Sequence, residues 1–175
     1  MIKSFVFSGG KLVGEDLGLD FVKTMLVDDD AQIWVDLEGP TQEEARSVLD
    51  GVFGFHPLAI EDCIAVSEQP KIDDYEKYLF MVIHAVAFTP EHKMETIELN
   101  MFIGRNILVT HHDKPLPSIR STIDRIKKNA SAVAKASDRL SYTILDFLFS
   151  NYEPAIDSLA ADIAELEKDV LTSRS

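Results

Sequence analysis

The chain has 175 residues, of which 46% are hydrophobic, so it can bury one medium-sized core without disulfides or a structural metal. Its 30 acidic and 17 basic residues give a net charge of −13, which argues against nucleic acid as a partner. The single cysteine, Cys63, excludes a disulfide framework and indicates a reducing compartment. The longest apolar run, Tyr78 to Phe88, is about half of the ~20 residues that a membrane-spanning helix needs.

Short strands and helices are predicted in the first third of the chain. In order, they are a hairpin of Ile2–Phe7 and Lys11–Val13, a helix within Leu17–Leu26, a strand at Gln32–Leu37 and a helix from Thr41 to about Val52. Thr41 is the expected N-cap of this last helix, because Glu44 three residues later completes a capping box. Trp34 lies inside the third strand, which is expected to be buried.

The middle of the chain predicts most of a sheet. The expected elements are a helix at Leu58–Ala65 after Pro57, strands at Lys71–Tyr75, Tyr78–Phe88, Thr96–Ile103 and Asn106–His111, and a helix from Ser118 to Ala130. The Tyr78–Phe88 strand is almost continuously apolar, which is typical of a central strand. The predicted fold class is therefore α/β (α+β mixed), a mixed β-sheet sandwiched by helices and followed by long acidic C-terminal helices.

The last forty residues have a different pattern. Apolar residues recur there at alternating spacings of three and four, as in a heptad repeat: Tyr142, Leu145, Phe149, Tyr152, Ile156, Leu159, Ile163, Leu166 and Val170. Pro154 is expected to kink this helix or to lie in the first turn of a second one. We expect residues 1–137 to form the α/β domain and residues 138–175 an acidic amphipathic helical segment. Because the repeat still runs at Val170 without a stop signal, we expect the natural protein to continue further.

One short helix carries the first candidate metal site. His56 precedes this helix, and Glu61 and Asp62 add two adjacent carboxylates. Neighbouring residues of a helix point about 100° apart, so both carboxylates cannot face one ligand squarely. The alternative is that the two carboxylates are solvated surface charges and that His56 is a hydrogen-bonded histidine before a proline.

His111 and His112, followed by Asp113, offer a second candidate, because imidazoles suit zinc or nickel. Consecutive strand residues point to opposite sides, however, which favours an ordinary strand end. His84 is expected in the core or in an interface. We expect no enzymatic activity, because nucleotide-binding, nucleophile-elbow and zinc-protease motifs are all missing and Cys63 has no basic neighbours to activate it.

The sequence closely resembles the cytosolic domain of the CorA family of magnesium transporters. The resemblance is carried by His56-Pro-Leu-Ala-Ile-Glu-Asp62, Pro70-Lys71-Ile72, Tyr75 and Tyr78-Leu79-Phe80, against a family pattern of about H-P-L-x-x-E-D, Q-R-P-K and Y-x-x-Y-L-F. It extends over most of the chain through Trp34-Val35-Asp36-Leu37, Phe53-Gly54-Phe55 and Leu145-Asp146. The chain departs from the pattern at Glu68-Gln69, where the family usually has Gln-Arg, and so loses one positive charge.

The resemblance implies a divalent-cation-sensing domain within a homopentamer at the cytoplasmic face of the cell (inner) membrane. A stalk, two membrane helices and a Gly-Met-Asn pore signature would complete each subunit, and these segments are absent from this chain. The matching metal ligands are Asp62, with Glu61 beside it, and Asp146. The implied ion is Mg²⁺, with Co²⁺, Ni²⁺ or Zn²⁺ as other candidates. Metal bound between subunits would favour the closed channel.

Two other functions remain open at this point. A transporter of zinc or another transition metal within the same superfamily shares the architecture, and His56, His111 and His112 support it. A non-transport oligomerisation module that uses the same fold is the other alternative.

Overall fold

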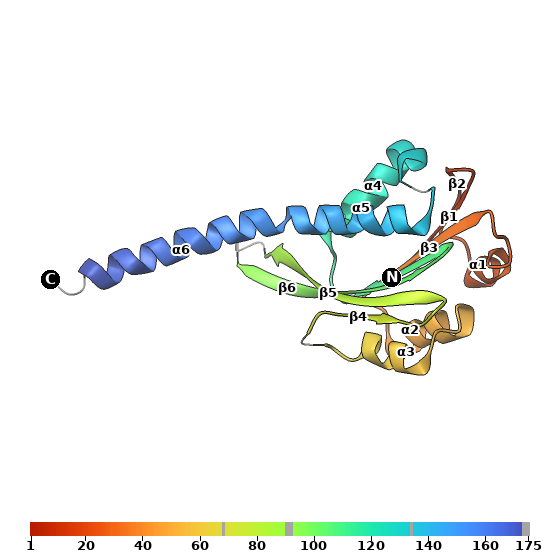
Figure 1. The fold of residues 1–175 in the computed structure, drawn as a ribbon, viewed down its shortest axis with the longest axis horizontal. Helices are drawn as coiled ribbons and strands as arrows, with labels where there is room; N and C mark the ends of the chain where they lie inside the picture. The colour runs from red at the N-terminus through yellow and green to blue at the C-terminus, as the bar shows by residue number, and fades with distance from the viewer. Residues whose placement is uncertain (68, 90–92, 134, 173–175) are drawn as a thin grey trace.

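A seven-stranded mixed sheet separates two layers of helices in the computed structural model, which describes residues 1–67, 69–89, 93–133 and 135–172 (Figure 1). The strands are β1 (Ile2–Ser8), β2 (Lys11–Glu15), β3 (Ala31–Glu38), β4 (Lys71–Asp74), β5 (Tyr78–Phe88), β6 (Met94–Gly104) and β7 (Ile107–His112). The helices are α1 (Leu19–Met25), α2 (Gln42–Arg46), the π-helical η1 (Ser47–Val52), α3 (Pro57–Ile64), α4 (Pro117–Asn129), the 3₁₀ turn η2 (Ala130–Ala132), α5 (Ser137–Ser150) and α6 (Tyr152–Thr172). The predicted fold class and the predicted elements are confirmed.

The strand order across the sheet is β2-β1-β3-β7-β6-β5-β4. Neighbouring strands are antiparallel except for β3 and β7, which run parallel and pair Asp36 with Thr110. The prediction that Tyr78–Phe88 is central was wrong in its position, because β5 lies next to the edge strand β4 and β7 occupies the middle. β5 is apolar because residues on both of its faces are buried. Any inner strand can be buried in this way, whether or not it is the central one.

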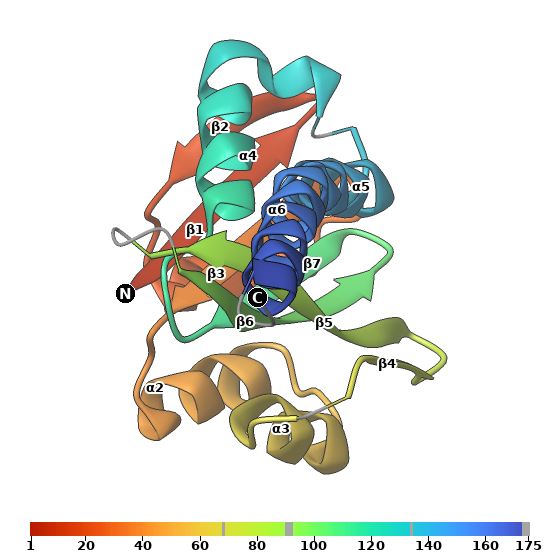
Figure 2. The same ribbon diagram turned by 90° about the vertical axis from the view of Figure 1, so that its left-hand side faces the viewer.

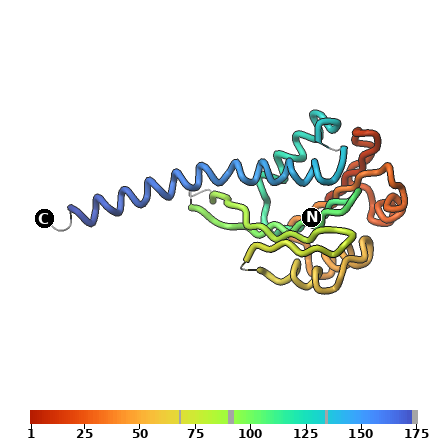
Figure 3. Tube along the Cα trace, viewed as in Figure 1, coloured from red at the N-terminus to blue at the C-terminus, as the bar shows by residue number. Residues whose placement is uncertain are grey.

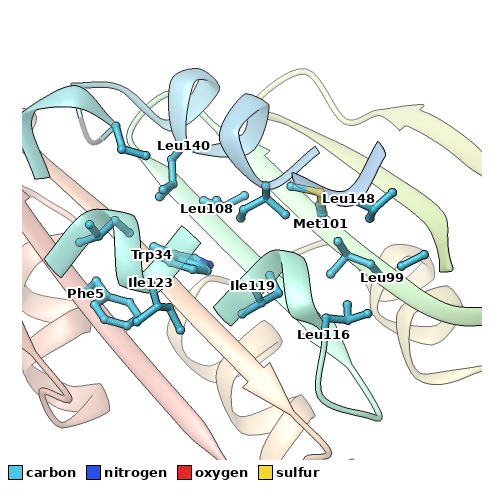
Figure 4. Packing of buried hydrophobic residues seen from close by; sticks show 14 of the residues in the cluster. Phe5, Trp34, Leu99, Met101, Leu108, Leu116, Ile119, Ile123, Leu140 and Leu148 are labelled. Atoms are coloured by element: carbon cyan, nitrogen blue, oxygen red, sulfur yellow. The ribbon is translucent and has the colours of Figure 1, made fainter. Parts of the chain in front are cut away.

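One layer of helices, α4 and α5, covers the first face of the sheet (Figure 2). Side chains from β1, β3, β6 and β7 interdigitate there with apolar residues of the two helices, and Trp34 is fully buried among them (Figure 4). The Trp34 ring stacks on Phe5 with a centroid distance of 5.0 Å. This core fixes α5 against the sheet.

The opposite face carries α1, α2, η1 and α3. The predicted capping box at the start of α2 is confirmed: Thr41 Oγ1 accepts from the Glu44 backbone nitrogen at 3.1 Å, and the Glu44 carboxylate accepts from the Thr41 nitrogen at 2.8 Å. The helix continues as η1, where the Phe53 nitrogen donates to the Val48 carbonyl at 3.2 Å. The chain then turns through Gly54, whose φ of +62° is a conformation that glycine adopts without strain.

The two C-terminal helices differ in their contacts. In α5, the residues that face the core are Leu140, Ile144 and Leu148, so the heptad positions predicted at Tyr142 and Phe149 are exposed instead. Helix α5 thus packs on the sheet, and the division expected between residues 137 and 138 stays a prediction. Helix α6 begins two residues before Pro154, which therefore lies in its first turn as one of the two expectations had it.

Helix α6 projects away from the domain (Figure 3). Ala155 is buried, but the later heptad positions on this helix are exposed: Ile156, Leu159, Ile163, Leu166 and Val170. Over the described ranges, no helix combines the length and the apolar character that crossing a bilayer requires.

Candidate metal centre

The start of α3 is organised by His56, which is the N-cap of the helix. Its Nδ1 accepts a hydrogen bond from the Leu58 nitrogen at 3.2 Å, and Pro57 occupies the first turn, where its missing N–H costs nothing. The His56 backbone nitrogen donates to the Tyr78 hydroxyl at 2.9 Å, and its ring lies 5.3 Å from that of Tyr75. His56 therefore agrees with the alternative interpretation, a hydrogen-bonded histidine before a proline.

Asp62 lies in the last turn of α3 and faces the edge strand β4. Its carboxylate pairs with the Lys71 ammonium, which also contacts Asp73 Oδ2 at 2.9 Å. Hydrogen bonds from Lys71 to Asp62 and then to Asp73 raise the pKa of the lysine. One ammonium is thus held by two half-exposed carboxylates, an arrangement in which a second cation could replace the first. Asp73 was not predicted as a site residue.

The three predicted ligands do not converge within one chain. Glu61 is exposed, and because adjacent helical residues point about 100° apart, it does not share the direction of Asp62. Asp146 lies on α5, across the sheet from α3 (Figure 1). Among the residues that the structure describes, no three His, Cys, Asp or Glu side chains are grouped closely enough to hold a metal ion. The three predicted ligands therefore do not form one metal site within the described part of the chain.

The second candidate pair, His111 and His112, is divided between the two faces of the sheet, as strand alternation predicts. His112 is fully buried, with Nε2 3.1 Å from Asp36 Oδ1 and Nδ1 2.6 Å from the Lys114 carbonyl oxygen. The Lys114 carbonyl only accepts, and the Asp36 carboxylate accepts when it is ionised, so this geometry favours donation by both ring nitrogens, as in an imidazolium.

A buried chain of hydrogen bonds completes the surroundings of Asp36. Trp34 Nε1 donates to Thr110 Oγ1 at 3.0 Å, and Thr110 Oγ1 donates to Asp36 Oδ1 at 2.5 Å. Burial by itself would lower the pKa of His112, but the hydrogen bond and charge of Asp36, together with the Lys114 carbonyl, raise it. Sequence reasoning missed this pair. Its only local signal is an aspartate inside an apolar strand.

The stability of the chain is expected to depend on pH through His112. Because its folded-state pKa is raised, its contribution is complete below the unfolded value of about 6.5 and is lost as pH rises through the folded value. The loss is about 1.4 kcal/mol for each unit by which the two values differ. Urea unfolding at several pH values should therefore show His112→Gln closing its gap to the wild type as pH increases.

His111→Gln is the matched control for this measurement. Burial lowers the pKa of His111, so its contribution is present above about pH 6.5 and is lost as pH falls. The difference in unfolding free energy between His111→Gln and the wild type should therefore shrink as pH falls, whereas the difference for His112→Gln should shrink as pH rises. A gap for His112→Gln that widens with rising pH would contradict a cationic His112. Glu38, the cross-strand partner of His112, also raises the pKa of His112 through its charge.

The sequence of this chain is similar to those of known metal-ion transporters. The model of the family described as CorA-like Mg²⁺ transporter protein matches residues 29–175. A putative metal ion transporter of Bacillus subtilis, YfjQ, is 36% identical over 140 residues, which are 80% of this chain and 43% of the relative. The cobalt/magnesium transport protein CorA of Thermotoga maritima is 25% identical over 146 residues, 82% of this chain and 42% of that protein. The chain thus spans less than half the length of these relatives.

Solved structures share the fold at lower sequence identity. The full-length CmaX protein has a TM-score of 0.77 at 14% identity and covers 94% of this chain and 50% of its own. The soluble domain of CorA from Methanocaldococcus jannaschii has a TM-score of 0.71 at 20% identity, over 98% of this chain and 65% of that one. The cytoplasmic domain of ZntB from Vibrio parahaemolyticus has a TM-score of 0.65 at 12% identity, over 77% of this chain and 54% of that one. From the match of its family model over most of the sequence, the chain belongs to the CorA-like Mg²⁺ transporter family.

Proposed function

We propose that the chain is the divalent-cation-sensing domain of a CorA-type transporter, located at the cytoplasmic face of the cell (inner) membrane. In this proposal, Mg²⁺ binds between neighbouring subunits of a homopentamer and favours the closed state. The proposal assigns no ion conduction to this chain, which spans less than half the length of its curated relatives. No catalytic role is proposed.

The observation that carries the proposal is the Lys71 ammonium held between Asp62 and Asp73. Two carboxylates that already share one cation are suited to Mg²⁺, which keeps most of its water and binds proteins through one or two carboxylates. The site lies beside β4 at the edge of the sheet, where a second subunit can approach. Ile72 on that strand is 63% exposed and Leu58 on α3 is 59% exposed, which gives the edge an apolar surface for such a contact.

Binding at a subunit boundary can act as a switch through simple electrostatics. Facing carboxylates of two subunits repel one another by about 4 kcal/mol at about 4 Å and an effective dielectric near 20. A divalent ion reverses this repulsion and holds the subunits together. Its loss lets them separate and shifts the population toward the open state. Glu61, exposed beside Asp62, and Asp146 on α5 are the further carboxylates that we assign to such shared sites.

The transition-metal alternative has weaker support. The likeness to the ZntB cytoplasmic domain concerns the fold alone. His56 uses its Nδ1 in the helix cap, and both nitrogens of His112 are engaged by Asp36 and Lys114. Co²⁺, Ni²⁺ and Zn²⁺ remain ions to be compared with Mg²⁺ in the experiment below, whereas a pure oligomerisation module would bind none of them at Asp62.

Competition between Lys71 and Mg²⁺ makes the proposal testable in the 175-residue chain. Lys71→Met removes the internal cation but keeps the aliphatic stem, so Mg²⁺ should bind about tenfold more tightly, a change of about 1.4 kcal/mol. Asp62→Asn should weaken binding by a similar factor, because it removes one of the carboxylates. Isothermal titration calorimetry with MgCl₂, and in parallel with CoCl₂, NiCl₂ and ZnCl₂, measures both changes.

Asp124→Asn, on the exposed side of α4, is the control and should leave Mg²⁺ binding unchanged. Weaker binding by Lys71→Met than by the wild type would mean that the lysine supports the site rather than competing for it, and the proposed sensing role of Asp62 would fail. A Zn²⁺ affinity that depends on His111 but not on Asp62 would favour the transition-metal alternative.

A further inference from the structure

A cavity of about 160 Å³ lies between the end of α3 and the sheet, on the face opposite α4 and α5. Its walls come from α3, the segment after it, β6, β7 and the residues after β7: Cys63, Ile64, Val66, Thr96, Ile97, Glu98, Asn100, His111, Asp113 and Lys114. None of the carboxylates proposed to bind Mg²⁺ lines it. A cavity of about 150 Å³ can hold a molecule the size of benzene.

Two buried polar atoms in the lining residues have no partner among the described residues. Asn100 and His111 are cross-strand neighbours on β6 and β7, and they are 1% and 7% exposed. Asn100 Nδ2 donates to Glu98 Oε1 at 2.9 Å, which fixes the amide so that its Oδ1 remains an unused acceptor. His111 Nδ1 is also without a hydrogen bond within the described chain. Buried polar groups are normally paired, so these two atoms point to a ligand.

Asn100 needs a hydrogen-bond donor, and His111 can accept from one in the tautomer that carries its hydrogen on Nε2. The amide oxygen of Asn100 can only accept. Burial lowers the pKa of His111, so at neutral pH its ring is uncharged and one of its nitrogens keeps a lone pair. Neither group suits an anion. The cavity therefore selects a ligand that offers N–H or O–H groups.

The charges around the cavity favour a cation. Glu98 is largely buried, with its side chain 13% exposed and its Oε2 4.0 Å from His84 Nε2, a nitrogen that is itself hydrogen-bonded to the Ser67 carbonyl oxygen. Asp113 adds a second carboxylate to the lining. The lysine in the lining, Lys114, is paired with Glu95. The walls also include Ile64 and Val66, which provide apolar surface for a hydrocarbon chain.

We propose that this cavity binds a small primary alkylamine. Its ammonium group donates to Asn100 Oδ1, His111 and the Glu98 carboxylate, and its short chain of about four carbons lies against Ile64 and Val66. An ammonium has three donors and no acceptor, which matches the unpaired amide oxygen of Asn100, the lone pair of a neutral His111 and one carboxylate. The site is separate from the Asp62 carboxylates and adds an organic cation to the ligands of the chain.

Calorimetric titration of the 175-residue chain with n-butylamine at pH 7.5 tests the proposal. We expect a dissociation constant on the order of 1 mM, as is common for a ligand of so few atoms. The neutral analogue 1-butanol should bind at least tenfold more weakly, because it lacks the charge. Glu98→Gln should weaken butylamine at least tenfold, while Glu153→Gln, on exposed α6, is the matched control and should change nothing.

A second variant covers the case in which Glu98→Gln disturbs folding, since Glu98 also accepts from the Ser67 nitrogen. Thr96 is exposed at the cavity, so Thr96→Trp can block it without entering the core, and it should abolish binding. Thermal unfolding confirms that each variant folds. Asp62→Asn should bind butylamine as the wild type does, which separates this test from that of the Mg²⁺ site.

Three results would overturn the assignment. Equal binding of butanol and butylamine would indicate an apolar pocket without charge selection. Displacement of butylamine by MgCl₂ in the Asp62→Asn variant would indicate a hydrated metal ion in the cavity. Unchanged butylamine binding in Thr96→Trp would place the amine elsewhere on this acidic protein.

Discussion

Asp36→Ala is expected to lower the free energy of unfolding by about 3–5 kcal/mol, the usual consequence of removing one partner from a buried ion pair. The substitution leaves the His112 imidazolium without its counter-ion and the Thr110 hydroxyl without its acceptor, both in fully buried positions. Because His112 must then lose its proton or remain unpaired, the loss should be larger below pH 6.5 than above it. Urea unfolding followed by the fluorescence of Trp34, the only tryptophan in the sequence, measures the effect.

The control for this prediction is Asp50→Ala on the exposed side of η1, which should change stability by no more than about 0.5 kcal/mol. Asp36→Asn keeps the shape and an acceptor, so it should be milder than Asp36→Ala. A loss below about 1 kcal/mol for Asp36→Ala would mean that the buried pair contributes little and that His112 is neutral in the folded chain.

Trp34→Ala is the second substitution with a large expected effect, again about 3–5 kcal/mol, because it opens a cavity in the core between the sheet and α5. The ring is 0% exposed, stacks on Phe5 and donates to Thr110, so packing and a hydrogen bond are lost together. Since the fluorophore is removed, unfolding should be followed by circular dichroism.

Trp34→Phe separates the two contributions. It keeps most of the aromatic packing but loses the Nε1 donor, so a loss of about 1–2 kcal/mol is expected. Phe149→Ala, an aromatic truncation on the exposed side of α5, should be nearly neutral. Similar losses for Trp34→Ala and Phe149→Ala would show that the core between α5 and the sheet is not tightly packed. Because Trp34 and Asp36 share Thr110, the double variant should not be additive.

The elements of the fold were predictable because each has a local signal. The capping box of Thr41 and Glu44 marked α2, and alternation or continuous apolarity marked the strands. The order of the strands has no such signal, since it depends on pairing between distant segments. Hence the position of β5 was misjudged, although its bounds were correct. The heptad positions predicted in α5 were wrong at Tyr142 and Phe149 for a related reason. Which side of a helix is buried depends on how the helix packs on the sheet.

The candidate metal centre was predictable in part. The resemblance selected Asp62, but its pairing with Lys71 and Asp73 arises only when β4 folds back beside α3. The opposite orientation of His111 and His112 followed from strand geometry alone. The partner of His112 did not, because Asp36 is brought to it by the parallel register of β3 and β7, two strands far apart in the sequence.

The projection of α6 gives the molecule a lever. The root of this helix is held by buried Ala155 and by the Tyr152 hydroxyl, which donates to the His84 carbonyl, while Ile156 to Thr172 are exposed. At 1.5 Å per residue this exposed arm is about 25 Å long. A tilt of about 5° at its root therefore moves the tip by roughly 2 Å, so displacements too small to disturb the packing of α5 are magnified at the far end.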